Sequence, residues 1–164
     1  SFHARKATKG CITMNNLHHF YYESPDFGSF VMSHNGHIYD ELSFDDKFVI
    51  KGDTDTEKFF YHLISRIENG FDIPKALSLA LKNLEDFRGA NLIFSTKEKS
   101  YITVFHTRSP KYYEMNLVKK GNSLIVSSEV IPLPGVEDID WISIKNNELV
   151  EIDHEKLTYE IKKI

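Results

Sequence analysis

Four short polar segments near the start of the chain carry the residue types that can do chemistry. They are His3-Ala4-Arg5-Lys6-Ala7-Thr8, Asn16-Leu17-His18-His19-Phe20, Ser33-His34-Asn35-Gly36 and Gly52-Asp53-Thr54-Asp55-Thr56-Glu57. Their side chains supply cations, carboxylates, amides and imidazoles, which bind charged groups and transfer protons. Each segment alone also has a structural explanation: Arg5 as a surface cation, Asn35-Gly36 as a tight turn, and residues 53–57 as a capped helix start.

In this order and at these separations, the four segments resemble the class II glutamine amidotransferase domain of the N-terminal-nucleophile (Ntn) hydrolases. That family has His-x-Arg-x-Ala-Thr, Asn-x-His-Pro-Phe, His-Asn-Gly, and then Thr-Asp-Thr/Ser-Glu at the start of a helix. The resemblance is specific over residues 3–57. It extends weakly to residues 127–129 and Trp141, as in smaller bacterial and archaeal members. His19 departs from the pattern, because a proline usually follows the family's histidine.

The resemblance implies five site residues. Asn35 and the Gly36 N–H would form the oxyanion hole for a tetrahedral intermediate. Arg5 would bind the α-carboxylate of glutamine through two charge-assisted hydrogen bonds. Asp55 would pair with the α-ammonium group, and Thr8 would line the glutamine pocket.

The nucleophile that the resemblance implies is a cysteine at the mature N-terminus, whose own α-amine acts as the base. In the family it lies upstream of the His-x-Arg motif, which begins here at His3, so we expect it on an N-terminal segment that these 164 residues do not include. Whether that segment is cleaved, separate or disordered stays open. Cys11 is expected to be a bystander, because its α-nitrogen is in a peptide bond. Ser1 is a disfavoured alternative, because the similarity places it on the strand that carries Arg5.

The expected function is release of ammonia from L-glutamine, with this chain alone inactive. The resemblance is compatible with an acceptor substrate or a partner subunit that receives the ammonia. No synthase domain follows residue 164, which favours a stand-alone amidotransferase. Two alternatives remain: a non-catalytic glutamine-binding or scaffold relative of the same fold, and an Ntn hydrolase acting on another amide.

Bulk properties exclude several other classes. The net charge is −4 and no basic cluster is apparent, so we expect no nucleic-acid partner. No apolar run approaches the ~20 residues of a membrane span. The single cysteine suits the cytoplasm. We expect no cofactor and no metal, since His3, His18 and His34 fall on motif positions that need none. The sequence is compatible with a homo-oligomer.

The periodicity predicts one α+β domain over residues 1–164. Two helices are expected: one from Asp53 or Thr54 to Asn69, and one from Asp72 to about Phe87. Strands are expected at residues 2–5, 20–22, 30–32, 91–95, 101–106, 112–118, 124–128, 141–144 and 149–152, with hairpins across residues 97–99, 121–122 and 146–147. Lys162-Lys163 is expected to be a solvated tail. Strands that are apolar on both faces need a second covering layer, which either another sheet or a part of the protein missing from this chain would supply. The resemblance implies the αββα four-layer sandwich of antiparallel sheets, incomplete at its N-terminus.

Overall fold

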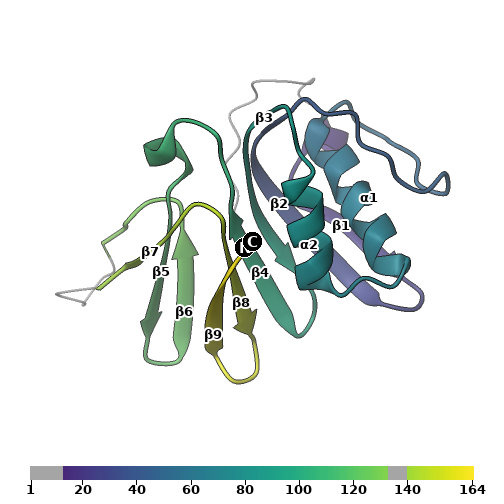
Figure 1. Ribbon diagram of the computed structural model, residues 1–164. Helices are drawn as coiled ribbons and strands as arrows, with labels where there is room; N and C mark the ends of the chain where they lie inside the picture. The colour runs from purple at the N-terminus through teal and green to yellow at the C-terminus, as the bar shows by residue number, and fades with distance from the viewer. Residues whose placement is uncertain (1–12, 133–139) are drawn as a thin grey trace.

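The computed structural model describes residues 13–132 and 140–164, which form an α+β fold with two antiparallel sheets and two adjacent α-helices (Figure 1). The expected strand at residues 2–5 lies outside the described residues. None of the described helices is long and apolar enough to cross a membrane.

The larger sheet has six strands in the order β1-β2-β3-β4-β8-β9, and every neighbouring pair is antiparallel. Its strands are β1 (Phe20–Ser24), β2 (Gly28–Ile38), β3 (Phe87–Ser95), β4 (Lys99–Val104), β8 (Glu148–Asp153) and β9 (Thr158–Lys163). The smaller sheet, in the order β6-β5-β7, consists of β5 (Met115–Lys120), β6 (Ser123–Ser127) and β7 (Ile142–Ile144). Two 3₁₀ turns, η1 (Met14–Asn16) and η2 (Pro110–Tyr113), precede β1 and β5.

The helices begin where their capping residues predict. Helix α1 (Asp55–Glu68) has Thr54 as its N-cap, whose hydroxyl accepts the Glu57 N–H at 3.3 Å. Helix α2 (Ile73–Lys82) is capped by Asp72, which accepts the Lys75 N–H at 2.9 Å. Each cap satisfies an N–H group that has no partner within its own helix.

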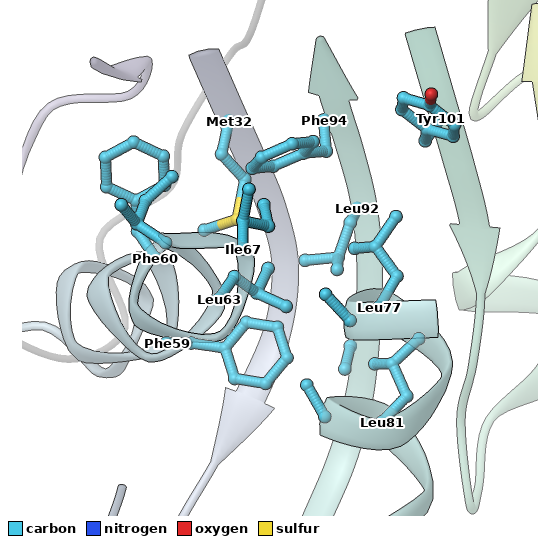
Figure 2. Packing of buried hydrophobic residues seen from close by; sticks show 14 of the residues in the cluster. Met32, Phe59, Phe60, Leu63, Ile67, Leu77, Leu81, Leu92, Phe94 and Tyr101 are labelled. Atoms are coloured by element: carbon cyan, nitrogen blue, oxygen red, sulfur yellow. The ribbon is translucent and has the colours of Figure 1, made fainter. Parts of the chain in front are cut away.

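Two buried clusters cover different parts of the six-stranded sheet, one on each face. On one face, Figure 2 shows Phe59 and Leu63 of α1 and Leu77 of α2 packing toward Leu92 and Phe94 of β3. The other face packs against the three-stranded sheet through a second buried cluster, whose members are Ile102, Val104, Met115, Leu117, Ile144, Val150 and Ile152. The second covering layer inferred from the doubly apolar strands is therefore a sheet.

The Asn35-Gly36 pair is not a tight turn, contrary to the expectation for Asn-Gly. Both residues lie within β2, opposite Asn91 and Ala90 of β3. Pairing with β3 along the whole second half of β2 outweighs the local preference of Asn-Gly for a turn, so the short run expected at residues 30–32 is an eleven-residue strand.

The predicted C-terminal end of the second helix is also wrong. Helix α2 ends at Lys82, and residues 87–89 belong to β3. The carboxylate of Asp40 accepts the N–H groups of Glu85 and Asp86, which turns the chain out of the helix. Phe87 can then pair with Ile38 of β2.

Three expectations for the second half of the chain are wrong as well. Strands β7 and β8 do not form a hairpin, because β7 pairs with β5 whereas β8 pairs with β4 and β9. Lys162 and Lys163 are not a solvated tail but the end of β9, where their amines pair with Glu151 and Glu148, each at 2.9 Å. The expected strand start at Tyr112 is a 3₁₀ turn, and β5 begins at Met115.

Candidate functional site

Strand β2 extends beyond the end of its neighbour β1. Pairing between the two strands stops where Phe20 faces Met32, whereas β2 continues to Ile38 alongside β3. Within the described residues, the second half of β2 therefore has a strand partner on one side only. We call its other side, at residues 33–38, the open edge of β2.

Three alternate N–H groups point toward this open edge. The His34 N–H donates to His18 Nδ1 at 3.3 Å, and the Ile38 N–H donates to Asp55 Oδ2 at 2.7 Å. Gly36 lies midway between them, and N–H groups two residues apart in a strand point the same way. Its cross-strand neighbour Ala90 donates its own N–H away from β2, to Phe105 O at 2.7 Å. The Gly36 N–H is thus aimed at the open edge, between two N–H groups that already have acceptors.

The Asn35 side chain lies beside this N–H and is uncommitted. Asn35 pairs with Asn91, so the two side chains share the sheet face opposite the helices. The Asn91 amide is occupied, because it donates to Tyr113 O at 2.8 Å and accepts the Phe105 N–H at 3.0 Å. No described residue forms a hydrogen bond with the half-exposed Asn35 amide, which leaves its N–H₂ group available to a ligand.

Asp55 lies in the first turn of α1, at the same edge. In addition to the Ile38 N–H, its carboxylate accepts the Thr56 N–H at 3.0 Å. The carboxylate borders an open pocket of about 520 Å³ lined by Ile38, Tyr39, Asp40, Glu41, Leu42, Phe44, Asp53, Asp55 and Lys58. Four carboxylates against one amine make this a favourable place for a cationic group.

Hydrogen bonds with two residues, Asn16 and Glu57, hold the loop that leads to Asp53 and Asp55. Asn16 donates to Asp53 Oδ1 at 2.6 Å and accepts the Asp53 N–H at 3.1 Å. The buried Glu57 carboxylate accepts the N–H groups of Lys51 at 2.9 Å and Gly52 at 2.7 Å. Gly52 must be a glycine here, since a Cβ would lie 2.2 Å from the Asn16 Oδ1 atom.

The buried His34 side chain connects the open edge to the same helix. Its Nδ1 lies 2.9 Å from Thr56 Oγ1, and its Nε2 lies 3.4 Å from Gly89 O. Burial lowers the pKa of His34, an effect that the nearby Asp55 charge opposes. Both ring nitrogens have protein partners, and no group of three histidine, cysteine, aspartate or glutamate side chains in the described part of the chain is placed to bind a metal ion.

The structure therefore brings together three of the five predicted site residues: Asn35, Gly36 and Asp55. Arg5 and Thr8 lie outside the described residues, as do Ser1, His3 and Cys11. The positioning contacts of Asn16 and Glu57 were not anticipated, although both residues belong to the motif segments. Asn91 lies in no motif, and nothing in the sequence signals its contact with Tyr113.

Comparison with known proteins gives a consistent result. Residues 2–104 match the family model described as glutamine amidotransferases class-II. An uncharacterised protein of Methanocaldococcus jannaschii is 27% identical over 189 residues, an alignment that covers 99% of this chain and 52% of that protein. The chain thus spans about half the length of this curated relative.

Solved structures share the fold. Glutamine phosphoribosylpyrophosphate amidotransferase from B. subtilis superposes with a TM-score of 0.71 at 16% identity, over 98% of this chain and 34% of that one. A protein described as a predicted glutamine amidotransferase from Pseudomonas aeruginosa gives a TM-score of 0.65 at 16% identity, over 92% of this chain and 66% of that one.

Proposed function

Since this chain belongs to the class II glutamine amidotransferases, we propose that the intact protein hydrolyses the side-chain amide of L-glutamine at the open edge of β2. The observation that carries this proposal is the pairing of two free donors with one carboxylate. Among the residues that the structure describes, neither the Asn35 amide nor the Gly36 N–H has a hydrogen-bond partner. The Asp55 carboxylate accepts the next N–H along the same strand edge, that of Ile38.

The spacing of these groups suits glutamine. Gly36 and Ile38 are two residues apart on β2, with a register irregularity between His37 and Ile38, so their N–H groups are at most about 7 Å apart. The short carbon chain of glutamine spans a distance of this order between its side-chain carbonyl and its α-ammonium group. With the ammonium on Asp55, the carbonyl oxygen comes to the donors of Asn35 and Gly36. Arg5 and Thr8 complete this proposal as the α-carboxylate ligand and a pocket wall, on the strength of the motif.

In the proposed reaction, a thiolate attacks the side-chain carbonyl carbon of glutamine. The electron pair of the C=O bond moves to oxygen, and the Asn35 N–H₂ group and the Gly36 N–H donate to the resulting oxyanion. The base takes the proton of the thiol and, in its protonated form, donates it to the leaving nitrogen, so that collapse of the intermediate breaks the C–N bond and releases ammonia. Water then hydrolyses the thioester to glutamate. We assign the thiolate to an N-terminal cysteine upstream of Ser1, and its α-amine to the role of base.

The same proposal extends to the whole fold and to the fate of ammonia. The described layers are helices, sheet and sheet, and we propose that the intact protein completes them to the αββα four-layer sandwich with a further helical layer. The amidotransferases among the similar structures suggest that ammonia passes to an acceptor substrate or partner subunit.

The test of this proposal is glutaminase activity of the full-length natural protein, measured as ammonia and glutamate released. Asn35→Ala should lower kcat about 100- to 1,000-fold, because it removes one donor to the oxyanion. Asp55→Asn should instead raise KM about 10- to 150-fold, the effect of losing a hydrogen bond to a charged group. Asn122→Asp and Asp26→Asn, on exposed turns, are the matched controls. A wild-type protein with an N-terminal cysteine but no activity on glutamine would refute the proposal.

A further inference from the structure

His34 lies between the strand that carries the two proposed oxyanion donors and the helix that carries Asp55. The ring is buried, with 4% of the residue's surface exposed, and it has one polar contact on each side. Nδ1 contacts Thr56 Oγ1 at 2.9 Å, next to Asp55 in the first turn of α1. Nε2 contacts Gly89 O at 3.4 Å, on the strand that pairs with β2.

The partners determine which ring nitrogen carries the proton. A carbonyl oxygen can only accept a hydrogen bond, so Nε2 must be the donor to Gly89. In a neutral imidazole Nδ1 is then an acceptor, and the Thr56 hydroxyl donates to it. Burial lowers the pKa of His34, which favours this neutral form. Two hydrogen bonds thus run in one direction: the Thr56 hydroxyl donates to His34, and His34 donates to the Gly89 carbonyl.

The Gly89 carbonyl in turn fixes the position of Gly36. A Cβ on Gly36 would lie 1.7 Å from Gly89 O and 2.8 Å from His34 Nε2, so the Gly36 backbone is in direct contact with both. The Tyr113 ring packs against Gly89, 2.4 Å from where a Cβ would be, which restricts movement of this residue. The Gly89 carbonyl itself contacts His34 and Gly36.

We propose that His34 is a positioning residue that couples the two ends of the glutamine site. Through Gly89 it sets the position of the Gly36 N–H, and through Thr56 it sets the first helical turn that presents Asp55. This inference rests on the proposed function for its catalytic consequence. The coupling itself is a property of the fold and can be measured separately.

Two substitutions of His34 separate its contacts. Asparagine places its amide near the position of Nδ1 and keeps a partner for Thr56, whereas glutamine reaches the position of Nε2 and keeps a donor to Gly89. In the full-length protein, His34→Asn should therefore lower mainly kcat, because the oxyanion donor is displaced. His34→Gln should raise mainly KM for glutamine, because Asp55 is displaced.

Thr56→Val removes the hydroxyl group that donates to His34 Nδ1, with little change in side-chain shape. It should raise KM about 2- to 13-fold, the effect of one neutral hydrogen bond, and Thr56→Ser should restore the wild-type value. Ser65→Ala is the control, since it removes a buried hydroxyl from the same helix that contacts Asp45 and Tyr61 rather than His34. A merely structural role of His34 predicts that Thr56→Val and Ser65→Ala lower the melting temperature alike and leave KM unchanged, and that result would overturn the proposal.

A second measurement keeps the inference testable if the wild-type protein has no glutaminase activity. The amide NMR signals of Asn35 and Gly36 should shift in Thr56→Val and stay in place in Ser65→Ala. Absence of activity together with shifted signals would reject the proposed function and retain the coupling. Unshifted signals in Thr56→Val would reject the coupling whatever the activity.

Discussion

Gly36→Ala is the most direct test of the proposed oxyanion donors. The added methyl carbon would lie 1.7 Å from Gly89 O and 2.3 Å from the Gly89 carbonyl carbon. Non-bonded heavy atoms are most stable at about 3.5–4.0 Å, so β2 and β3 must separate locally by more than about 1 Å. Forcing an extra methyl group into a packed site costs about 1–3 kcal/mol. A displacement of about 1 Å at a reacting group can lower the rate by about 100-fold.

Gly28→Ala provides a control on the same strand. Gly28 has φ +78°, and a Cβ there would meet nothing within 4 Å. Alanine at this position therefore has only the backbone cost of a left-handed conformation, about 1–2 kcal/mol. The two variants should lose similar amounts of stability for different reasons, but only Gly36→Ala displaces the proposed site.

The assay combines urea unfolding, followed by circular dichroism, with glutaminase kinetics of the full-length protein. We expect both variants to fold and to lose about 1–3 kcal/mol. We expect kcat/KM to fall about 100-fold in Gly36→Ala and to stay near the wild-type value in Gly28→Ala. If folded Gly36→Ala were as active as Gly28→Ala, the Gly36 N–H would have no part in the reaction.

Two further predictions follow from buried polar groups. Glu57→Gln should destabilise the protein by about 1–3 kcal/mol and raise KM for glutamine. The reason is that the single oxygen of an amide cannot accept the N–H groups of both Lys51 and Gly52. Urea denaturation and glutaminase kinetics measure the two effects, and an unchanged KM would contradict the prediction. Burial lowers the pKa of His34 and of His62 below the usual value of 6.5, so the unfolded chain binds protons that the folded chain does not as the pH falls through about 6.5. The free energy of unfolding should therefore be highest above about pH 6.5 and decline below it, and equal urea midpoints at about pH 7.5 and about pH 5.5 would contradict this.

Features set by neighbouring residues could be predicted from the sequence. The two helix starts depend on contacts within three residues: the structure selects Thr54 from the two expected caps Asp53 and Thr54, and it begins the second helix directly after Asp72, as expected. The same is true of the β3–β4 and β5–β6 hairpins, whose turns are short. The Asn35, Gly36 and Asp55 positions came from the motif, and the structure brings them together although about twenty residues separate them.

Features set by distant partners could not be predicted. The turn at Asn146 reads locally as a hairpin, but its side chain bonds both the N–H and the carbonyl of His106, 40 residues away. The residues that precede and follow this turn belong to different sheets, because β7 pairs with β5 and β8 pairs with β4. Half of the residues of β9 are charged and most are exposed, so it lacks a buried apolar face, and its two lysines pair with glutamates of β8.

The open edge of β2 exists because the chain leaves β1 at a particular residue. In the register of Phe20 with Met32 and Tyr21 with Val31, a β1 extended toward the N-terminus would place His18 opposite His34 and Asn16 opposite Gly36. The backbone of Asn16 would then be able to satisfy the Gly36 N–H and close the site. Instead, His18 accepts the His34 N–H through its ring, and Asn16 is turned into a 3₁₀ turn by its two hydrogen bonds to Asp53. Within the described part of the chain, the Asn-x-His segment therefore leaves the Gly36 N–H, the proposed oxyanion donor, without a partner, because Asn16 bonds Asp53 and does not pair with Gly36.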